Sequence, residues 1–92
     1  MGKTRITVHL PAHRRAALHI ERDTSDAAQA YDQYIGEYLQ FLRDEAERAG
    51  YALGSDHQDN GGIFTIDEID HAGKKAAHDW LHTQPDIWNW IP

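Results

Sequence analysis

The chain has 92 residues, of which 40% are hydrophobic and 26% are charged, and it contains no cysteine. This length and composition predict one small globular domain over residues 1–92 with a modest core. Without cysteine, disulfides and thiolate chemistry are excluded, and the lack of a signal-peptide pattern adds to the expectation of a cytoplasmic protein. No apolar run approaches the ~18 residues of a membrane span, so no membrane association is expected.

The formal net charge is −6, and it is unevenly distributed along the chain. Residues 1–22 hold five basic side chains and one acidic one, whereas residues 23–92 hold four basic and fourteen acidic ones. So acidic a segment opposes phosphate binding, which argues against nucleic acid as a partner. It favours a partner protein that is larger or more basic than this chain.

The first predicted element is a half-buried strand over Thr4–Leu10. Its apolar residues Ile6 and Val8 alternate with polar neighbours, as in a strand with one face against a core. With Pro11 after it, the segment resembles the DNA-reading strand of ribbon–helix–helix repressors, a likeness confined to this strand. That fold requires two short helices directly after the strand, whereas a second strand and one long helix are predicted here.

The alternation of apolar and polar residues resumes over Arg15–Arg22, which predicts the second strand of a first hairpin. In this hairpin, His9 and His19 could face each other across the strands. The alternative is a short helix over Ala12–His19, because alanine-rich segments favour helix.

The longest predicted element is an amphipathic helix over Thr24–Gly50, around which the rest of the chain is expected to be organised. Asp23 and Thr24 are typical N-cap residues, and Gly50 is the residue type that ends helices in a left-handed conformation. The predicted apolar arc, which is expected to cover a small sheet, contains Ala27, Tyr31, Tyr34, Ile35, Tyr38, Leu39, Phe41, Leu42, Ala46 and Ala49.

Gly36 lies opposite this arc, at a cost of roughly 1 kcal/mol relative to alanine. It is either a tolerated defect or a place where another backbone, such as a second copy of the chain, approaches closely. Gly36 and the neighbouring Glu37 are therefore candidate partner-binding residues.

A second hairpin is predicted over residues 51–66, with strands Tyr51–His57 and Ile63–Ile66 around an Asp-Asn-Gly-Gly turn. Thr65 and Glu68 then form a capping box that starts a second helix over Ile66–Thr83. The resulting order, ββαββα, predicts an α+β two-layer sandwich. Its four-stranded antiparallel sheet would carry both helices on one face.

A stripe of histidines is predicted on the polar side of the second helix. His71, His78 and His82 point the same way, and His78 and His82 are one turn apart, which suits two ligands of a divalent ion. The string from His78 to His82 resembles the H-E-x-x-H zincin motif, but Asp79 stands in place of the glutamate that acts as general base. The stripe is either a solvated polar face, a weak metal site or a pH-sensing group.

The C-terminal segment, residues 85–92, is unusually apolar for a chain end. Trp88 and Ile91 either close a small core or, with Trp90, form an anchor for a partner, because tryptophan is common among interface hot spots. At the other end, Arg5, Arg14 and Arg15 are candidates for a local nucleic-acid contact.

These patterns predict a small, acidic, non-enzymatic protein–protein interaction module. A regulator, an inhibitor or an immunity-type protein is the form expected, phage-borne or carried by a mobile element, acting as a nucleic-acid mimic or as a homodimer. One alternative is a histidine-based divalent metal-binding protein or small metallohydrolase that uses His78 and His82. The other is a weak nucleic-acid binder that uses the basic N-terminal hairpin. No cofactor is expected.

Overall fold

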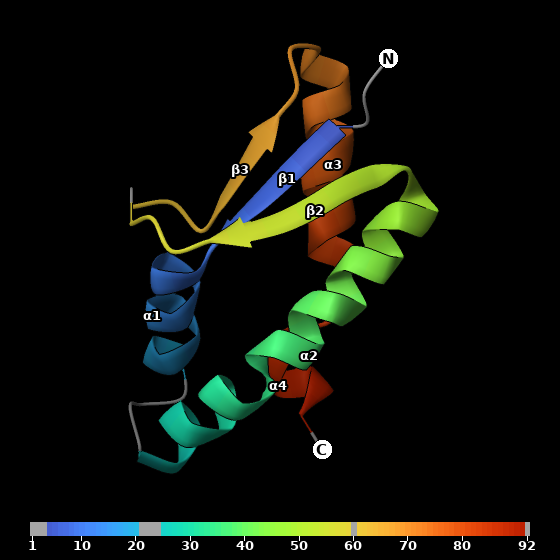
Figure 1. Ribbon diagram of the computed structural model, residues 1–92. Coiled ribbons are helices and arrows are strands. Elements are labelled where there is room, and N and C mark those ends of the chain that lie inside the picture. The colour runs from blue at the N-terminus through green and yellow to red at the C-terminus, as the bar shows by residue number, and fades with distance from the viewer. Residues whose placement is uncertain (1–3, 21–24, 60, 92) are drawn as a thin grey trace.

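The computed structural model describes residues 4–20, 25–59 and 61–91, which form an α+β fold (Figure 1). The α+β class is as predicted, but the order of elements is not ββαββα. The described elements, in chain order, are β1 (Thr4–His9), α1 (Leu10–Ile20), α2 (Ser25–Ala49), β2 (Tyr51–Asp56), β3 (Phe64–Asp67), α3 (His71–Thr83) and α4 (Ile87–Trp90).

The described sheet has three strands in the order β2-β1-β3 and is mixed, so the predicted four-stranded antiparallel sheet is wrong. β1 pairs in parallel with β2 and antiparallel with β3. Ile6 lies opposite Leu53 on one side and Ile66 on the other, which forms an apolar row across the sheet. The central place belongs to the strand whose Ile6 and Val8 side chains are fully buried.

The predicted second strand, Arg15–Arg22, is wrong over its described part, because these residues belong to α1. The alternative helix over Ala12–His19 is correct, although α1 is longer, at Leu10–Ile20. Pro11 lies in the first turn, where its missing N–H costs nothing. Ala12, Ala17 and Leu18 are buried, at a helical spacing that the apparent alternation concealed. The strand of β1 is therefore followed directly by two helices.

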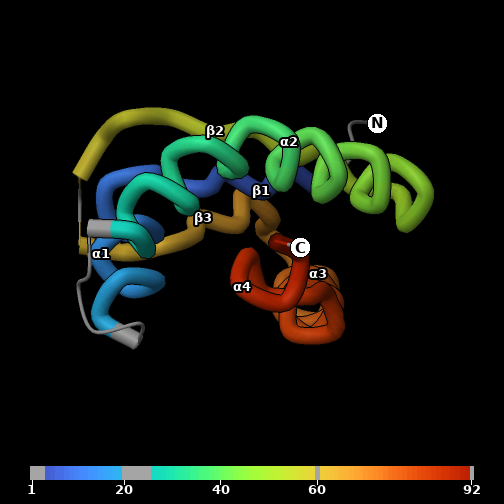
Figure 2. The backbone as a smooth tube through the Cα atoms, turned by 90° about the horizontal axis from the view of Figure 1, so that it is seen from below, coloured from blue at the N-terminus to red at the C-terminus, as the bar shows by residue number. Residues whose placement is uncertain are grey.

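The long helix is confirmed as α2, Ser25–Ala49, and the predicted caps Asp23 and Thr24 lie outside the described residues. The arc predicted to be apolar supplies five buried residues, Tyr31, Tyr38, Leu39, Leu42 and Ala46. Gly50 has a φ of 91°, the left-handed conformation expected after a helix. Helix α2 runs along β2, whereas α3 contacts β1 and β3 (Figure 2).

The predicted hairpin over residues 51–66 is wrong, although both of its strands exist. β2 and β3 are separated by β1, so the chain passes across the end of the central strand between them. The two helices after β1 bring the chain back to the starting end of β1, so β2 runs parallel to β1 along one of its edges. The other edge of β1 is then free to pair with β3. Gly61 has the positive φ expected of the turn signal, at 88°, but it lies in a crossing loop.

The second long helix begins later than predicted, at His71 rather than Ile66. The Thr65–Glu68 capping box does not form, because Glu68 accepts hydrogen bonds from the Thr4 hydroxyl and the Asp70 backbone N–H. Asp70 caps the helix instead, accepting a hydrogen bond of 3.1 Å from the Gly73 N–H. The helix ends at Thr83, as predicted, before Pro85.

One face of the sheet carries the core, and the other is open. Ile6, Val8 and Leu53 belong to one buried cluster with residues of α1, α2, α3 and α4. On the opposite face, Arg5 and Ala52 are exposed, since side chains alternate along a strand. On this open face, a polar side chain therefore lies next to side chains of the adjacent strands, and not next to those of its neighbours in sequence.

Gly36→Ala is expected to raise the free energy of unfolding by about 1 kcal/mol, because alanine has the higher helix propensity. No atom lies within 4 Å of the position that the added Cβ would occupy. Urea unfolding of the full chain measures the difference. Gly50→Ala is the matched control: it has equal space, but its φ of 91° predicts destabilisation. A destabilised Gly36→Ala would indicate that another backbone packs against this position.

Candidate functional site

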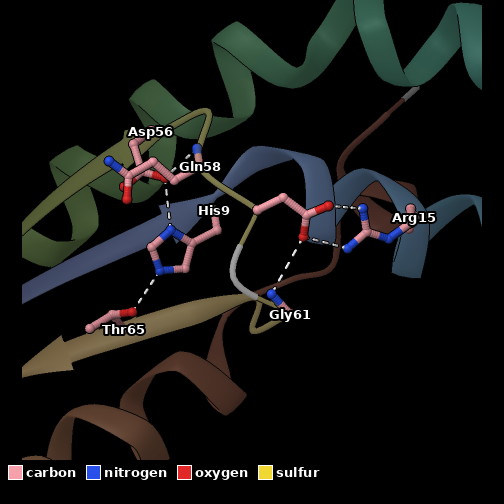
Figure 3. A network of polar contacts seen from close by, with 7 residues as sticks. His9, Arg15, Asp56, Gln58, Gly61 and Thr65 are labelled. Atoms are coloured by element: carbon pink, nitrogen blue, oxygen red, sulfur yellow. Dashed lines mark hydrogen bonds and ion pairs between the residues drawn. The ribbon is translucent and has the colours of Figure 1, made fainter.

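Three polar side chains join the three strands at one end of the open face (Figure 3). His9 ends β1, and its Nδ1 lies 2.7 Å from Asp56 Oδ1 on β2. Its Nε2 lies 2.6 Å from Thr65 Oγ1 on β3. The His9 side chain is only 5% exposed. With its hydrogen on Nδ1, the ring donates to the carboxylate and accepts from the hydroxyl, so both nitrogens are satisfied.

The loop after β2 is held by two carboxylates. The hydrogen bond from His9 lowers the pKa of Asp56, and the Gln58 backbone N–H adds to this effect. Further along, Arg15 on α1 donates hydrogen bonds of 2.6 and 2.8 Å to the two oxygens of Asp59, which lowers the pKa of Asp59. In Figure 3, His9 and Arg15 lie on opposite sides of this loop, and their contacts with Asp56 and Asp59 hold it near the end of β1.

The order hydroxyl, imidazole, carboxylate is the one in which a nucleophile, its base and an orienting acid occur in hydrolases. Here the three groups come from three adjacent strands, one group from each. The contacts connect the edge strands to the centre. We therefore interpret Asp56, His9 and Thr65 as a cross-strand polar clamp.

The clamp was not predicted, and the expected facing of His9 and His19 is wrong. His19 lies on α1 and is exposed. The alternation of β1 placed His9 on the polar side, which is correct. Its partners depend on the strand order, and no local pattern in the sequence indicates that β1 separates β2 from β3.

A cleft of about 350 Å³ lies on the helix side, between α1, α2, the start of β3 and the segment that joins α3 to α4. Its polar and aromatic lining includes His13, Tyr38, Phe64 and Asp86. The His13 ring lies 6.2 Å from the Tyr38 ring and 6.5 Å from the Phe64 ring, measured between centroids. Because these residues are up to 73 positions apart, from His13 to Asp86, only the fold gathers them.

Burial favours the neutral form of the histidine in this cleft. His13 Nδ1 lies 2.6 Å from the Tyr31 hydroxyl. Burial lowers the pKa of His13, and the opposing effect of Asp86 is smaller. Tyr38 donates a hydrogen bond of 2.6 Å to the Pro85 carbonyl, and burial raises the pKa of Tyr38 to about 12. The Asp86 carboxyl group therefore lies beside two aromatic side chains whose neutral forms are favoured by burial.

The histidine stripe places His78 and His82 side by side, with ring centroids 4.5 Å apart. Asp79, between them in sequence, accepts a hydrogen bond of 2.7 Å from Lys75, which lowers the pKa of Asp79. Within residues 4–20, 25–59 and 61–91, no group of three or more His, Cys, Asp or Glu is arranged to hold a metal ion. Metal binding by the pair stays a prediction.

The three arginines predicted to contact nucleic acid are not on one hairpin. Arg14 and Arg15 lie on α1, where Arg14 pairs with Asp32 at 3.0 Å and Arg15 pairs with Asp59. Arg5 is exposed on β1, opposite Asp67 of β3. Each positive charge therefore has a carboxylate nearby or in contact, which weakens its attraction for phosphate.

The C-terminal segment lies against the core and keeps some exposed surface. Ile87 is buried, and the Trp88 indole N–H donates a hydrogen bond of 3.1 Å to the Ala17 carbonyl. The Trp90 ring lies 6.0 Å from Tyr34 and 6.1 Å from Tyr38. Trp88, Trp90 and Ile91 are each partly exposed, and on α2 both Gly36 and Glu37 are exposed. Partner binding by these five residues stays a prediction.

His9→Ala is expected to lower the free energy of unfolding by about 2 kcal/mol, because a buried side chain and its two part-buried hydrogen bonds, one of them to a carboxylate, are lost. Chemical denaturation of the full chain measures the change. His19→Ala is the control: it removes an exposed histidine and is expected to change stability by less than about 0.5 kcal/mol. Equal effects of the two substitutions would contradict the clamp.

Asp56→Asn is expected to flatten the acid side of the stability profile. The pKa of Asp56 is lowered in the fold, so its ionised form stabilises the protein above its ordinary pKa of 3.8, and this contribution is lost as the pH falls through the lower, folded value. The variant should thus be less stable than wild type at neutral pH, and the difference should shrink in acid. Urea midpoints of wild type and variant, measured from neutral to acidic pH, give this stability difference. Asp44→Asn, on the exposed side of α2, is the charge-matched control. A difference that stays constant on acidification would count against the ionised pair.

No described helix is long and apolar enough to cross a bilayer. Comparison with known proteins found no matching protein family, no matching curated protein and no matching solved structure.

Proposed function

We propose that the chain is a small, acidic, non-enzymatic interaction module. It pairs with a second copy of itself along β2, and it acts as a regulator, inhibitor or immunity-type partner of a more basic protein. The observation that carries the proposal is the outer edge of β2, which pairs with no other described strand.

β2 is an edge strand whose described strand neighbour is β1 alone. Its six residues, Tyr-Ala-Leu-Gly-Ser-Asp, include no lysine, arginine or proline. Those are the residues that discourage pairing at the edge of a sheet. The outward backbone groups of such an edge require water or another strand as a partner. Antiparallel pairing of two copies about a twofold axis would satisfy them and give a continuous sheet.

The opposite edge is less suited to pairing. β3 has four residues and ends at Asp67, which is followed by Glu68. A short strand with carboxylates at its end is one of the devices that keep edges from associating. The asymmetry between the two edges favours a closed dimer through β2 over an open chain of copies.

The acidic surface supports a basic partner. Asp32, Glu37, Asp44 and Glu47 are all exposed on α2, and they form part of the surplus that gives the chain its net charge of −6. Such a surface attracts basic proteins and can occupy a groove made for nucleic acid. The metal-binding and nucleic-acid alternatives have less support, because His78 and His82 have no third described ligand and two of the three arginines are paired with aspartates.

Gly54→Lys is expected to convert the dimer into a monomer. Gly54 lies in β2 with no atom within 4 Å of an added Cβ, so the lysine fits the fold and places a charge at the edge. Light scattering coupled to gel filtration measures the mass, expected at twice the 10.5 kDa of the chain for wild type.

Gly36→Lys is the matched control, because it adds the same charge at a second open glycine, on α2. It should leave the dimer intact. A wild-type chain that is monomeric even at millimolar concentration would exclude pairing along β2. If Gly36→Lys lost the dimer and Gly54→Lys kept it, the dimer interface would lie on α2 rather than on β2.

A further inference from the structure

We propose that the helix-side cleft binds an arginine side chain on the surface of the basic partner. The cleft combines an exposed aromatic ring, an apolar wall and one carboxylate, which together match the flat, charged head and the aliphatic stem of arginine. The inference rests on the proposed function only in that the partner is basic. It does not depend on dimerisation, since no residue of β2 lines the cleft.

The size and lining of the cleft suit one side chain. Its volume of about 350 Å³ is at the lower end of the range of about 300–1,000 Å³ for sites that enclose small ligands. Phe64 is 40% exposed, so its ring is open to a ligand. Ala16, Leu81 and Pro85 add apolar wall against which an aliphatic stem can pack.

Asp86 supplies the carboxylate that favours a cation in the cleft, whose other titratable lining residues are His13, His82 and Tyr38. Asp86 is exposed, and no described lysine or arginine forms an ion pair with it. One of its oxygens accepts the Trp88 backbone N–H at 3.1 Å, which fixes the carboxylate at the start of α4. Burial lowers the pKa of His13, which favours its neutral form and so reduces its repulsion of a cation. An anionic ligand would instead face Asp86.

Arginine fits these groups better than lysine. A guanidinium is planar, stacks on aromatic faces and is more weakly hydrated than an ammonium, so it loses less on entering a partly apolar recess. It can lie over Phe64 and donate to Asp86, whereas the compact ammonium of lysine matches the carboxylate alone.

The test uses the full chain and three probes: the capped tripeptide Gly-Arg-Gly, the same peptide with neutral citrulline, and n-butylguanidinium, which has the guanidinium and an aliphatic stem without a peptide. Backbone amide NMR shifts of His13, Phe64 and Asp86 are followed during titration. The arginine peptide should give saturable shifts at these residues, and the citrulline peptide should give none.

Two substitutions assign the contacts. Asp86→Asn removes the charge but keeps the helix cap, since asparagine caps as well as aspartate, and it should raise the Kd of the arginine peptide about threefold or more. Asp70→Asn is the matched control, because Asp70 caps α3 in the same way and does not line the cleft. It should leave the Kd unchanged. Phe64→Leu keeps an apolar side chain without the ring and should also weaken binding.

Equal binding of the arginine and citrulline peptides, or equal effects of Asp86→Asn and Asp70→Asn, would overturn the assignment of a cation site. Tighter binding of n-butylguanidinium, which has the same charge as the peptide, would indicate a small free ligand and would overturn the protein partner. A monomeric wild-type chain that still binds the arginine peptide at the cleft would refute pairing along β2 and leave this inference standing.

Discussion

The fold depends on the burial of one short strand, β1. Strands β2 and β3 flank it, and the helices cover one of its faces. Ile6 and Val8 of β1 are fully buried, and β1 is hydrogen-bonded to β2 on one side and β3 on the other. This central position requires the chain to leave β1, pass through α1 and α2 and return in the same direction, because parallel strands need a long connection. Helix α2 is the consequence: it supplies the return path and covers β2 with its apolar arc.

The central strand also determines where polar groups meet. His9 emerges at the end of β1 with one strand on either side, so its two ring nitrogens reach Asp56 and Thr65 at once. A histidine on an edge strand would have one such neighbour. On the helix side, the departure of α1 from the same end of β1 brings His13 into the cleft with Phe64 and Asp86. The clamp and the cleft are thus two results of one topological choice.

Local periodicity in the sequence predicts most of the helices and strands. It does not predict the order of the strands in the sheet, nor the contacts that depend on that order. α2, with its apolar arc and the glycine after it, follows from helical spacing and is correct, and both β2 and β3 are placed within about two residues. Arg15–Arg22 shows the limit, since Ala16, Leu18 and Ile20 alternate like a strand while Ala12, Ala17 and Leu18 give the helical face that is used. The Asp-Asn-Gly-Gly pattern correctly predicts a change of chain direction. It does not indicate whether the two strands that it connects pair with each other or lie on either side of a third strand. For that reason the clamp and the aromatic cleft, built from residues distant in sequence, could not be found in advance.

The bond from the Trp88 indole to the Ala17 carbonyl joins residues 71 positions apart. Closing so large a loop costs configurational entropy before any contact repays it, and topologies rich in distant contacts fold slowly. The assembly of α2 against β2 is local by comparison. We expect a folding reaction in which the α2–β2 unit forms early and the docking of β3, α3 and α4 comes last, so that the rate-limiting barrier lies with the C-terminal third of the chain.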